Sequence, residues 1–389
     1  MNLPLFFIAC ILGISSYGQS YLTGTIYFGQ DSLIEYQAGN LPIILSAPHG
    51  GHESPATLPD RNCSGCVTVK DSYTQKLARE IAAALIFKTG CYPHLIINKL
   101  HRKKLDANRE IIEATDSNSA TEVYWHNYMN FIDSAKRSIS SKYQKSIFLD
   151  IHGHGHAIQR IELGYLLSSS DLRKSDSVLN SPPTNLKASI LNLRFSTLTS
   201  QPLSELIRGK HSFGSLLHAK GFPTVPSDSI PFPLVGEPYF NGGYNTRRFG
   251  SQTGGTIDAI QIEHNWDVRA NPAIRTRLAD SLAQVILDFL ELHYFTDFSS
   301  YACNFFTGTE EYTKKKVTAY PNPFSTHIEL KEVSNNSTFS LFSQEGMHVM
   351  TGTLTDNFTV DLSHLSQGIY YLSIRNKTSF TTLKLVKCS

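Results

Sequence analysis

Residues 41–53 read LPIILSAPHGGHE, a nearly continuous apolar run that ends in a glycine-containing turn with two histidines and a glutamate. Ile-rich apolar runs of this length are typical of strands that are buried on both faces of a sheet. The pattern recurs in SIFLDIHGHGH at 146–156 and TIDAIQIEHN at 256–265. We therefore predict three buried strands, each continuing into charged or metal-binding side chains: 41–47, 146–151 and 256–262.

Amphipathic segments alternate with these apolar runs. Residues 71–89 carry apolar side chains at helical spacing and are followed by Gly90, a residue typical of helix C-termini. A second helix is predicted from Pro272 to about Tyr294, with Asn271 as its N-cap. Alternating strands and helices favour an α/β sheet. The stretch 168–199 is rich in Ser, Asn and Leu and is predicted to be an insertion or long loop over one face.

Length and composition bound the function. The 389 residues allow one large domain and a smaller module, and the composition, 41% hydrophobic and 17% charged, is that of a globular protein. A formal net charge of +2 gives no support for nucleic-acid binding.

The first 19 residues have the apolar run and small polar end of a secretory signal peptide, although a basic start is missing. The run from Leu3 to Ile14 is too short to span a bilayer comfortably, although a permanent anchor is the alternative. No other segment is apolar enough to cross a membrane. We predict a signal peptide (1–19), a main domain (20–306), a linker (307–316) and a small all-β domain (317–389).

Five cysteines remain after the signal peptide, so at least one is unpaired. Cys63 and Cys66 are close in a loop of an exported chain, which favours a local disulfide over two free thiols.

The three strand ends carry the chemistry. Ligand sites in open α/β sheets lie outside the carboxyl ends of the strands, where His49, Glu53 and His152 follow the first two runs. Two histidines and a carboxylate are a common ligand set for catalytic Zn²⁺. Asp150, two residues before His152 on the same strand face, is a suitable hydrogen-bond partner for that ring. We interpret His52, His154 and His156 as surface residues.

The same segments also resemble a known family. SAPHGG at 46–51, LDANRE at 105–110, LDIHGHG at 149–155 and YFNGGY with IQIEHN within 239–265 are similar, in this order, to motifs of N-formylglutamate amidohydrolases. These proteins belong to the zinc-carboxypeptidase-like hydrolases. The resemblance covers about residues 40–295 and implies a phosphorylase/hydrolase-like mixed sheet flanked by helices, together with a Zn²⁺ cofactor.

Site roles follow from this resemblance. It implies zinc ligation by His49, Glu53 and His152, and it implies that Glu263 is the general base. Asn108 and Arg109 stand where the family binds a substrate carboxylate, Arg102 is placed to bind the carboxylate or the oxyanion, and Tyr244 is placed to contact the transition state. The carboxypeptidase pattern has two residues between its first His and Glu, whereas three separate His49 from Glu53. His52 is therefore an alternative ligand.

The tail from Val317 resembles the C-terminal sorting domain of type IX secretion substrates, with YPNPF at its start and DLSHLSQGIYYLSI near its end. This resemblance implies the type IX secretion machinery as a partner and a secreted or cell-surface location. A permanent β-sandwich adhesion module is the alternative.

These observations predict a secreted zinc-dependent hydrolase that cleaves an amide bond of an N-acyl amino acid or short peptide near a free carboxylate. The alternative is a surface binding protein that keeps the hydrolase fold without catalysis. A serine hydrolase is disfavoured because the chain has no GxSxG motif.

Overall fold

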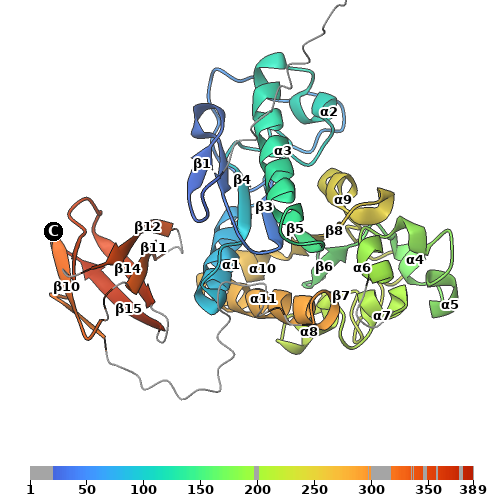
Figure 1. The fold of residues 1–389 in the computed structure, drawn as a ribbon. Coiled ribbons are helices and arrows are strands. Elements are labelled where there is room, and N and C mark those ends of the chain that lie inside the picture. The colour runs from blue at the N-terminus through green and yellow to red at the C-terminus, as the bar shows by residue number, and fades with distance from the viewer. Residues whose placement is uncertain are drawn as a thin grey trace, which may run out of the picture.

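The computed structural model describes residues 21–196, 201–296, 298, 317–333, 335, 337–344, 348–355, 358–375 and 380–388. The predicted signal peptide (1–19) and linker (307–316) lie outside these residues. Described residues form two bodies with separate apolar cores, a mixed α/β body and a C-terminal all-β body (Figure 1).

An eight-stranded mixed sheet organises the first body, in the order β1-β2-β4-β3-β5-β8-β6-β7. The four central strands β4, β3, β5 and β8 run parallel, whereas β1, β2 and the β6–β8 pair are antiparallel. The strands are β1 (Ile26–Phe28), β2 (Ile34–Gln37), β3 (Ile43–Ala47), β4 (His94–Asn98), β5 (Ser146–Gly153), β6 (Ile161–Gly164), β7 (Thr224–Val225) and β8 (Ile257–His264).

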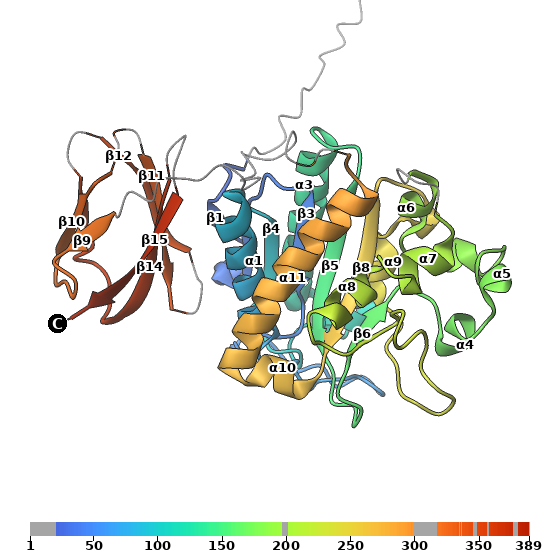
Figure 2. The same cartoon turned by 90° about the horizontal axis from the view of Figure 1, so that it is seen from below.

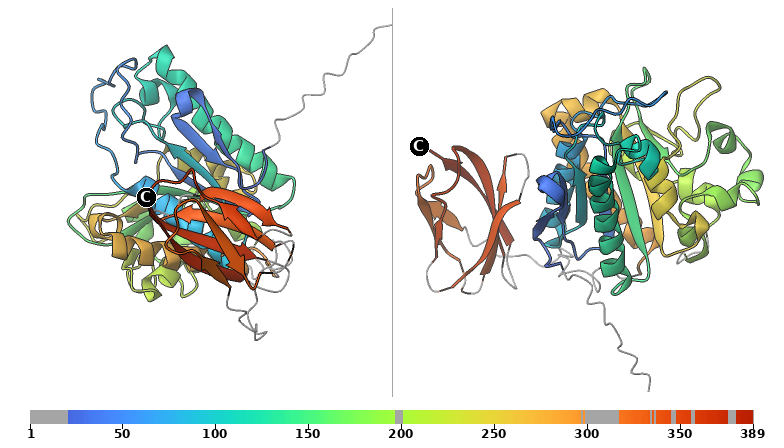
Figure 3. Two further views of the ribbon diagram at one scale, coloured as in Figure 1. Left: turned by 90° about the vertical axis from the view of Figure 1, so that its left-hand side faces the viewer. Right: turned by 90° about the horizontal axis from the view of Figure 1, so that it is seen from above.

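Helices cover both faces of this sheet. On one face α1 and α11 pack against each other, and α1 also packs on β3, β4 and β5; α3 covers β2, β3 and β4 on the other face, beside α9 over β5 and β8 (Figures 2 and 3). The longer helices are α1 (Thr74–Thr89), α3 (Ser119–Ser140), α8 (Phe213–Ala219) and α11 (Pro272–His293). The shorter ones are α2 (Ile111–Thr115), α4 (Ser169–Leu172), α5 (Asp176–Leu179), α6 (Leu191–Ser196), α7 (Leu203–Arg208), α9 (Tyr244–Phe249) and α10 (Trp266–Ala270).

The three strands predicted from apolar runs are β3, β5 and β8, and they are adjacent and parallel in the sheet. Their side chains are buried on both faces because helices cover both. The α/β class with a mixed sheet is thus confirmed.

Helix termini follow local sequence signals. The Asn271 side chain accepts hydrogen bonds from the backbone of Ala273 and Ile274, and Pro272 occupies the first helical position of α11. Gly90 ends α1 with a φ of 67°, a conformation that favours glycine. The other end of α1 differs from the prediction, since the helix begins at Thr74 rather than at residue 71.

The Ser- and Asn-rich stretch after β6 is more ordered than a long loop. Its described part contains the short helices α4, α5 and α6, and several of its apolar side chains belong to the main core. Ser168 caps α4 in a capping box with Asp171, a role for which Ser is well suited.

The C-terminal body consists of two antiparallel sheets, β13-β10-β9 and β12-β11-β14-β15. Ile328, Val360, Leu341 and Leu372, from strands of both sheets, share one core, as the alternating pattern of the tail predicts. The strands are β9 (Thr318–Tyr320), β10 (His327–Lys331), β11 (Ser337–Ser343), β12 (His348–Leu354), β13 (Thr359–Asp361), β14 (Gly368–Arg375) and β15 (Phe380–Lys387).

Candidate metal centre

The register between β5 and β8 places four polar side chains together. Asp150 pairs with Gln261, and His152 pairs with Glu263. Paired residues share a face and alternate residues of a strand repeat it, so all four side chains lie on one face near the carboxyl ends of the two strands.

His49 reaches the same place from the loop after β3. The Asn98 amide at the end of β4 donates a hydrogen bond to the Pro48 carbonyl at 2.8 Å, which fixes the start of this loop. Gly51 is required further on, because a Cβ there would lie 2.2 Å from the Leu100 carbonyl oxygen. The imidazole of His49 is buried as a result.

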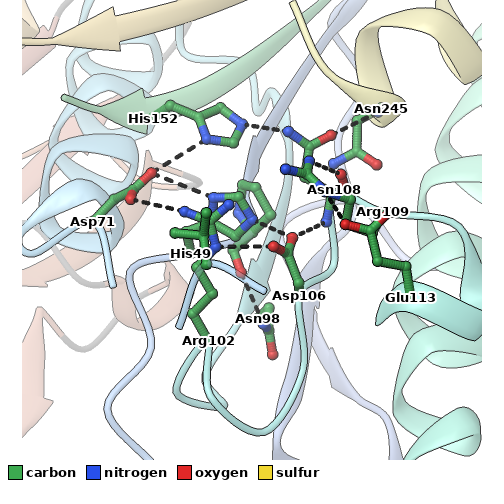
Figure 4. A network of polar contacts seen from close by, with 12 residues as sticks. His49, Asp71, Asn98, Arg102, Asp106, Asn108, Arg109, Glu113, His152 and Asn245 are labelled. Carbon is green, nitrogen blue, oxygen red and sulfur yellow. Dashed lines mark hydrogen bonds and ion pairs between the residues drawn. The ribbon is translucent and has the colours of Figure 1, made fainter. Parts of the chain in front are cut away.

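Asp71 completes a compact group with the two histidines (Figure 4). Its Oδ2 atom lies 3.4 Å from His49 Nδ1 and 3.2 Å from His152 Nδ1. All three side chains are buried, and their possible ligand atoms lie within 4.8 Å of one another. Asp71 itself is oriented by the backbone N–H of Gly153, which donates to Oδ2 at 3.2 Å.

The outer nitrogens of both imidazoles face carboxylates. His49 Nε2 lies 2.6 Å from Asp106 Oδ1, and His152 Nε2 lies 2.9 Å from Asp150 Oδ2. A carboxylate accepts hydrogen bonds, so each Nε2 is suited to donate to its carboxylate, and Nδ1 is the atom of each ring that faces Asp71. The prediction that Asp150 supports His152 agrees with this contact.

The Nδ1 atoms of both rings thus face one carboxylate oxygen, at hydrogen-bond distance in the case of His152. Among the described residues, buried His49 Nδ1 has no hydrogen-bond partner, which is costly unless a cation is bound. Ligand atoms of a tetrahedral zinc site lie about 3.3 Å apart, since each bond is about 2.0–2.1 Å long. The separations of 3.2 and 3.4 Å fit this geometry.

The electrostatics of the group also favour positive charge. Burial alone would lower the pKa of His152, but Asp150, Asp71 and Glu263 outweigh it and raise that pKa well above the ordinary value. A site that favours a proton so strongly also favours a metal cation, which competes for the same lone pair.

Glu53 is not a member of this group, contrary to the prediction. Its side chain is 45% exposed and lies 3.3 Å from His52 Nε2, whose own side chain is 69% exposed. The backbone of Glu53 hydrogen-bonds to Lys99 and His101, which holds this part of the loop against the end of β4 and away from the two Nδ1 atoms. Asp71 is the carboxylate that lies beside the two buried histidines, whereas His52 and Glu53 both lie outside this group.

Sequence reasoning missed Asp71 because the helical pattern extends back to it. Since α1 begins only at Thr74, Asp71 lies in the preceding loop, where its N–H donates to the His49 carbonyl at 3.0 Å. Asp106 was also missed, although a histidine ligand requires an acceptor for its second N–H. The signal for Asp106 was its place in the LDANRE motif.

Asp106 gives a testable prediction. We expect Asp106→Asn to weaken zinc affinity by about 10- to 100-fold, because the carboxylate that accepts the His49 Nε2 proton is lost while the side-chain shape is kept. Competition with a chelator of known affinity measures this change. Asp60→Asn is the matched control, since Asp60 is half-exposed and pairs with Lys103 and Lys104. Equal affinities for the wild type and Asp106→Asn would remove Asp106 from the site.

Glu263 lies beside the group and is buried. Burial raises its pKa to about 8, while His152 opposes this shift. The Gln261 side-chain amide donates to Glu263 Oε1 at 2.9 Å, and the Asn108 amide donates to Gln261 Oε1 at 3.4 Å. A chain of amides thus fixes one oxygen of the predicted base.

Asn108 and Tyr244 have different surroundings from those predicted. Asn108 lines the cavity, but its Oδ1 accepts the Asn245 N–H at 2.7 Å, which connects it to the start of α9. Asn108 is therefore partly a structural residue. Tyr244 packs towards Trp125 and Arg248 and is not among the residues that line the cavity.

The two arginines also differ from each other. Arg102 donates from Nε to Asp106 Oδ2 at 2.9 Å, and its Nη1 lies 3.6 Å from Asp71 Oδ1, so it neutralises the carboxylates around the histidines. Arg109 lies in a more open position and pairs with the exposed Glu113 at 2.7 Å. Both line a cavity of about 170 Å³ together with His49, Val67, Asp71, Asn108, His152, Gly153, Phe240, Gly242, Gly243, Gln261 and Glu263.

A second cluster, His154, His156 and Glu162, has a different character. Both ring nitrogens of His154 have protein partners, with the Arg160 carbonyl 2.8 Å from Nε2 and the His156 N–H 3.1 Å from Nδ1. Glu162 Oε1 is 3.0 Å from His156 Nδ1, and Arg160 Nε lies within 3.9 Å of the same oxygen. Hydrogen bonds account for this cluster, and a cation would have to displace them.

A local disulfide closes a loop beside the cavity. Cys63 and Cys66 form a disulfide, as predicted, and Cys388 is free and exposed. Arg61 donates to the Cys66 sulfur and to the carbonyls of Val67 and Arg102, which holds the disulfide loop at the edge of the cavity.

Comparison with known proteins identifies the C-terminal body. Residues 318–388 match the secretion system C-terminal sorting domain. The chain is therefore a cargo of type IX secretion, which delivers it to the cell surface or exterior. The secretion machinery is accordingly one of its partners. Over the described residues, no helix has the length and apolarity that a bilayer span requires.

The mixed-sheet body has weaker relationships. No curated protein sequence matches the chain. Among solved structures, it is similar to the gene product Atu2144 from Agrobacterium tumefaciens, with 12% sequence identity and a TM-score of 0.40 over 67% of this chain and 95% of that one. That similarity is too low to support an argument about function.

Proposed function

We propose that the mixed-sheet body is a zinc-dependent hydrolase that cleaves an amide bond near a free carboxylate. The observation that carries the proposal is the convergence of His49 Nδ1, His152 Nδ1 and Asp71 Oδ2, with both Nε2 atoms facing carboxylates. A buried glutamate stands next to this convergence. Three protein ligands and a nearby carboxylate are the arrangement that zinc hydrolases use.

The chain's own residues divide the work. His49, Asp71 and His152 would hold a zinc ion, which would supply Lewis acidity and make a bound water more acidic. Glu263 takes a proton from the attacking water and returns it to the leaving amine, because a carboxyl with a raised pKa is well matched to both transfers. Gln261 holds one oxygen of Glu263, and we assign the proton exchange to the other oxygen.

Arg109 is the residue we propose for the substrate carboxylate. A guanidinium can bind both carboxylate oxygens. The Glu113 partner of Arg109 is exposed, so a substrate carboxylate can take its place. Arg102 is a weaker candidate because Asp106 and Asp71 already engage it. The order of the sequence motifs, which resembles that of N-formylglutamate amidohydrolases in a phosphorylase/hydrolase-like fold, supports the same assignment.

Metal analysis with turnover tests the proposal. We expect the purified protein to hold about one zinc per chain, to hydrolyse members of a panel of N-acyl amino acids and dipeptides, and to lose this activity on chelation and regain it when zinc is added. A protein that binds zinc but turns over no member of the panel would instead favour a surface binding protein that keeps the fold. A protein that binds no zinc would contradict the proposal.

A further inference from the structure

Two exposed apolar side chains line the proposed catalytic cavity. Val67 is 47% exposed and Phe240 is 44% exposed, whereas the metal-facing residues of the same cavity are buried. Single exposed apolar residues are common on protein surfaces. Here two exposed apolar side chains share one small cavity, and buried polar groups hold each of them. This arrangement is typical of a ligand-binding surface. We refer to Val67 and Phe240 as the apolar lip.

Glu162 and His156 hold Phe240 in place. Its backbone N–H donates to Glu162 Oε2 at 2.8 Å, and Glu162 is completely buried in β6. Its ring stacks on the imidazole of His156, with ring centroids 4.6 Å apart and an interplanar angle of 15°. The Glu162 carboxylate orients both the backbone of Phe240 and the ring on which Phe240 stacks, so the partly exposed Phe240 side chain is held in place.

Val67 comes from a distant part of the chain, and its backbone is also held by a buried side chain. Its carbonyl accepts a hydrogen bond from Arg61 Nη1 at 3.2 Å, and the disulfide between Cys63 and Cys66 closes the loop directly before it. Arg61 is buried and also donates to the Arg102 carbonyl at 3.1 Å. Both parts of the apolar lip are therefore preorganised, which reduces the entropy cost of binding a ligand.

We propose that the apolar lip selects substrates whose acyl group is apolar and larger than formyl, such as an acyl chain of several carbons or an aromatic acyl group. This inference rests on the proposed amide hydrolase function. The proposal places the scissile amide at the metal, the free carboxylate at Arg109 and the acyl group against Val67 and Phe240, the exposed apolar residues that line the same cavity. A formyl group has no methylene to cover Val67 and Phe240, so it leaves their apolar surface in water.

The test compares two substrates that share one amino acid, an N-formyl and an N-hexanoyl derivative. For the wild type we expect kcat/KM to be at least about tenfold higher for the hexanoyl substrate, the size of effect that a few methylenes have in an apolar pocket. In Phe240→Ala with Val67→Ser we expect the two values to become similar, through a higher KM for the hexanoyl substrate. Val69→Ala and Leu234→Ala are matched controls, since both side chains are exposed and neither lines the cavity.

Binding provides a second readout that does not need turnover. Calorimetry with the Glu263→Gln protein should show tighter binding of N-hexanoyl than of N-formyl amino acid, and this difference should disappear when the apolar lip is replaced. Equal binding of both compounds, or equal turnover by the wild type, would overturn the inference. Lip-dependent binding of the hexanoyl compound by a wild type that hydrolyses neither would instead overturn the proposed function and support the apolar lip.

Discussion

Asp71→Asn should lose stoichiometric zinc binding, while Glu53→Gln keeps it. The asparagine side chain has no negative charge to offer a cation beside the two Nδ1 atoms. We therefore expect the zinc affinity to fall further than the about 10- to 100-fold that is lost when a hydrogen-bond partner of a ligand is removed. Glu53 is exposed and paired with His52, so its replacement should leave both affinity and activity within about twofold. Zinc titration of the metal-free proteins measures both values.

Folding must be controlled in this comparison, because Asp71 also accepts the Gly153 N–H. Thermal melts of the metal-free wild type and Asp71→Asn should be similar, since the isosteric amide oxygen can still accept this hydrogen bond. If Glu53→Gln lost zinc and Asp71→Asn retained it, Glu53 would be the ligand and Asp71 would not.

Glu263→Gln is expected to bind zinc normally and to lose about 10²- to 10⁴-fold in kcat/KM, the usual contribution of a general base. Steady-state kinetics beside a zinc titration separate these two properties. A carboxylate must be ionised to act as a base, so wild-type kcat/KM should fall as the pH drops through the pKa of this group. Burial raises the pKa of Glu263 to about 8, and a bound cation favours the ionised form, which places the acid limb between 4.5 and about 8.

The stability of the metal-free protein should change with pH in the opposite direction to the activity. A carboxyl whose pKa is raised on folding stabilises the folded state below its unfolded pKa, and this stabilisation is lost as the pH rises through the folded pKa of about 8. Metal-free wild type should therefore melt lower at pH 9 than at pH 6 relative to Glu263→Gln. Full activity of Glu263→Gln would remove Glu263 from the mechanism.

The sequence was most informative where one local pattern determined the outcome. Apolar runs identified three of the four central strands, and the residues at their ends, His49, His152 and Glu263, lie together because adjacent parallel strands end at one edge. The caps at Asn271 and Gly90 were likewise local. The match to a sorting domain agrees with the pattern of the tail.

It was less informative where a residue's role depends on distant contacts. Glu53 has the right chemistry close to His49, but the pairing of its backbone with the end of β4 turns it to solvent. Asp71 lies 22 positions after His49 and resembles the start of a helix. The sequence predicts Arg102 as a substrate-binding cation, but in the structure Arg102 donates a hydrogen bond to Asp106. These outcomes depend on loop paths that no periodicity encodes.

The most direct test of the metal centre is anomalous diffraction at the zinc absorption edge from crystals of the protein equilibrated with zinc. We predict one strong peak within bonding distance of His49 Nδ1, His152 Nδ1 and Asp71 Oδ2, about 2.0–2.2 Å from each atom. A peak at His52 and Glu53, a peak at His154 and His156, or no peak at all would contradict it.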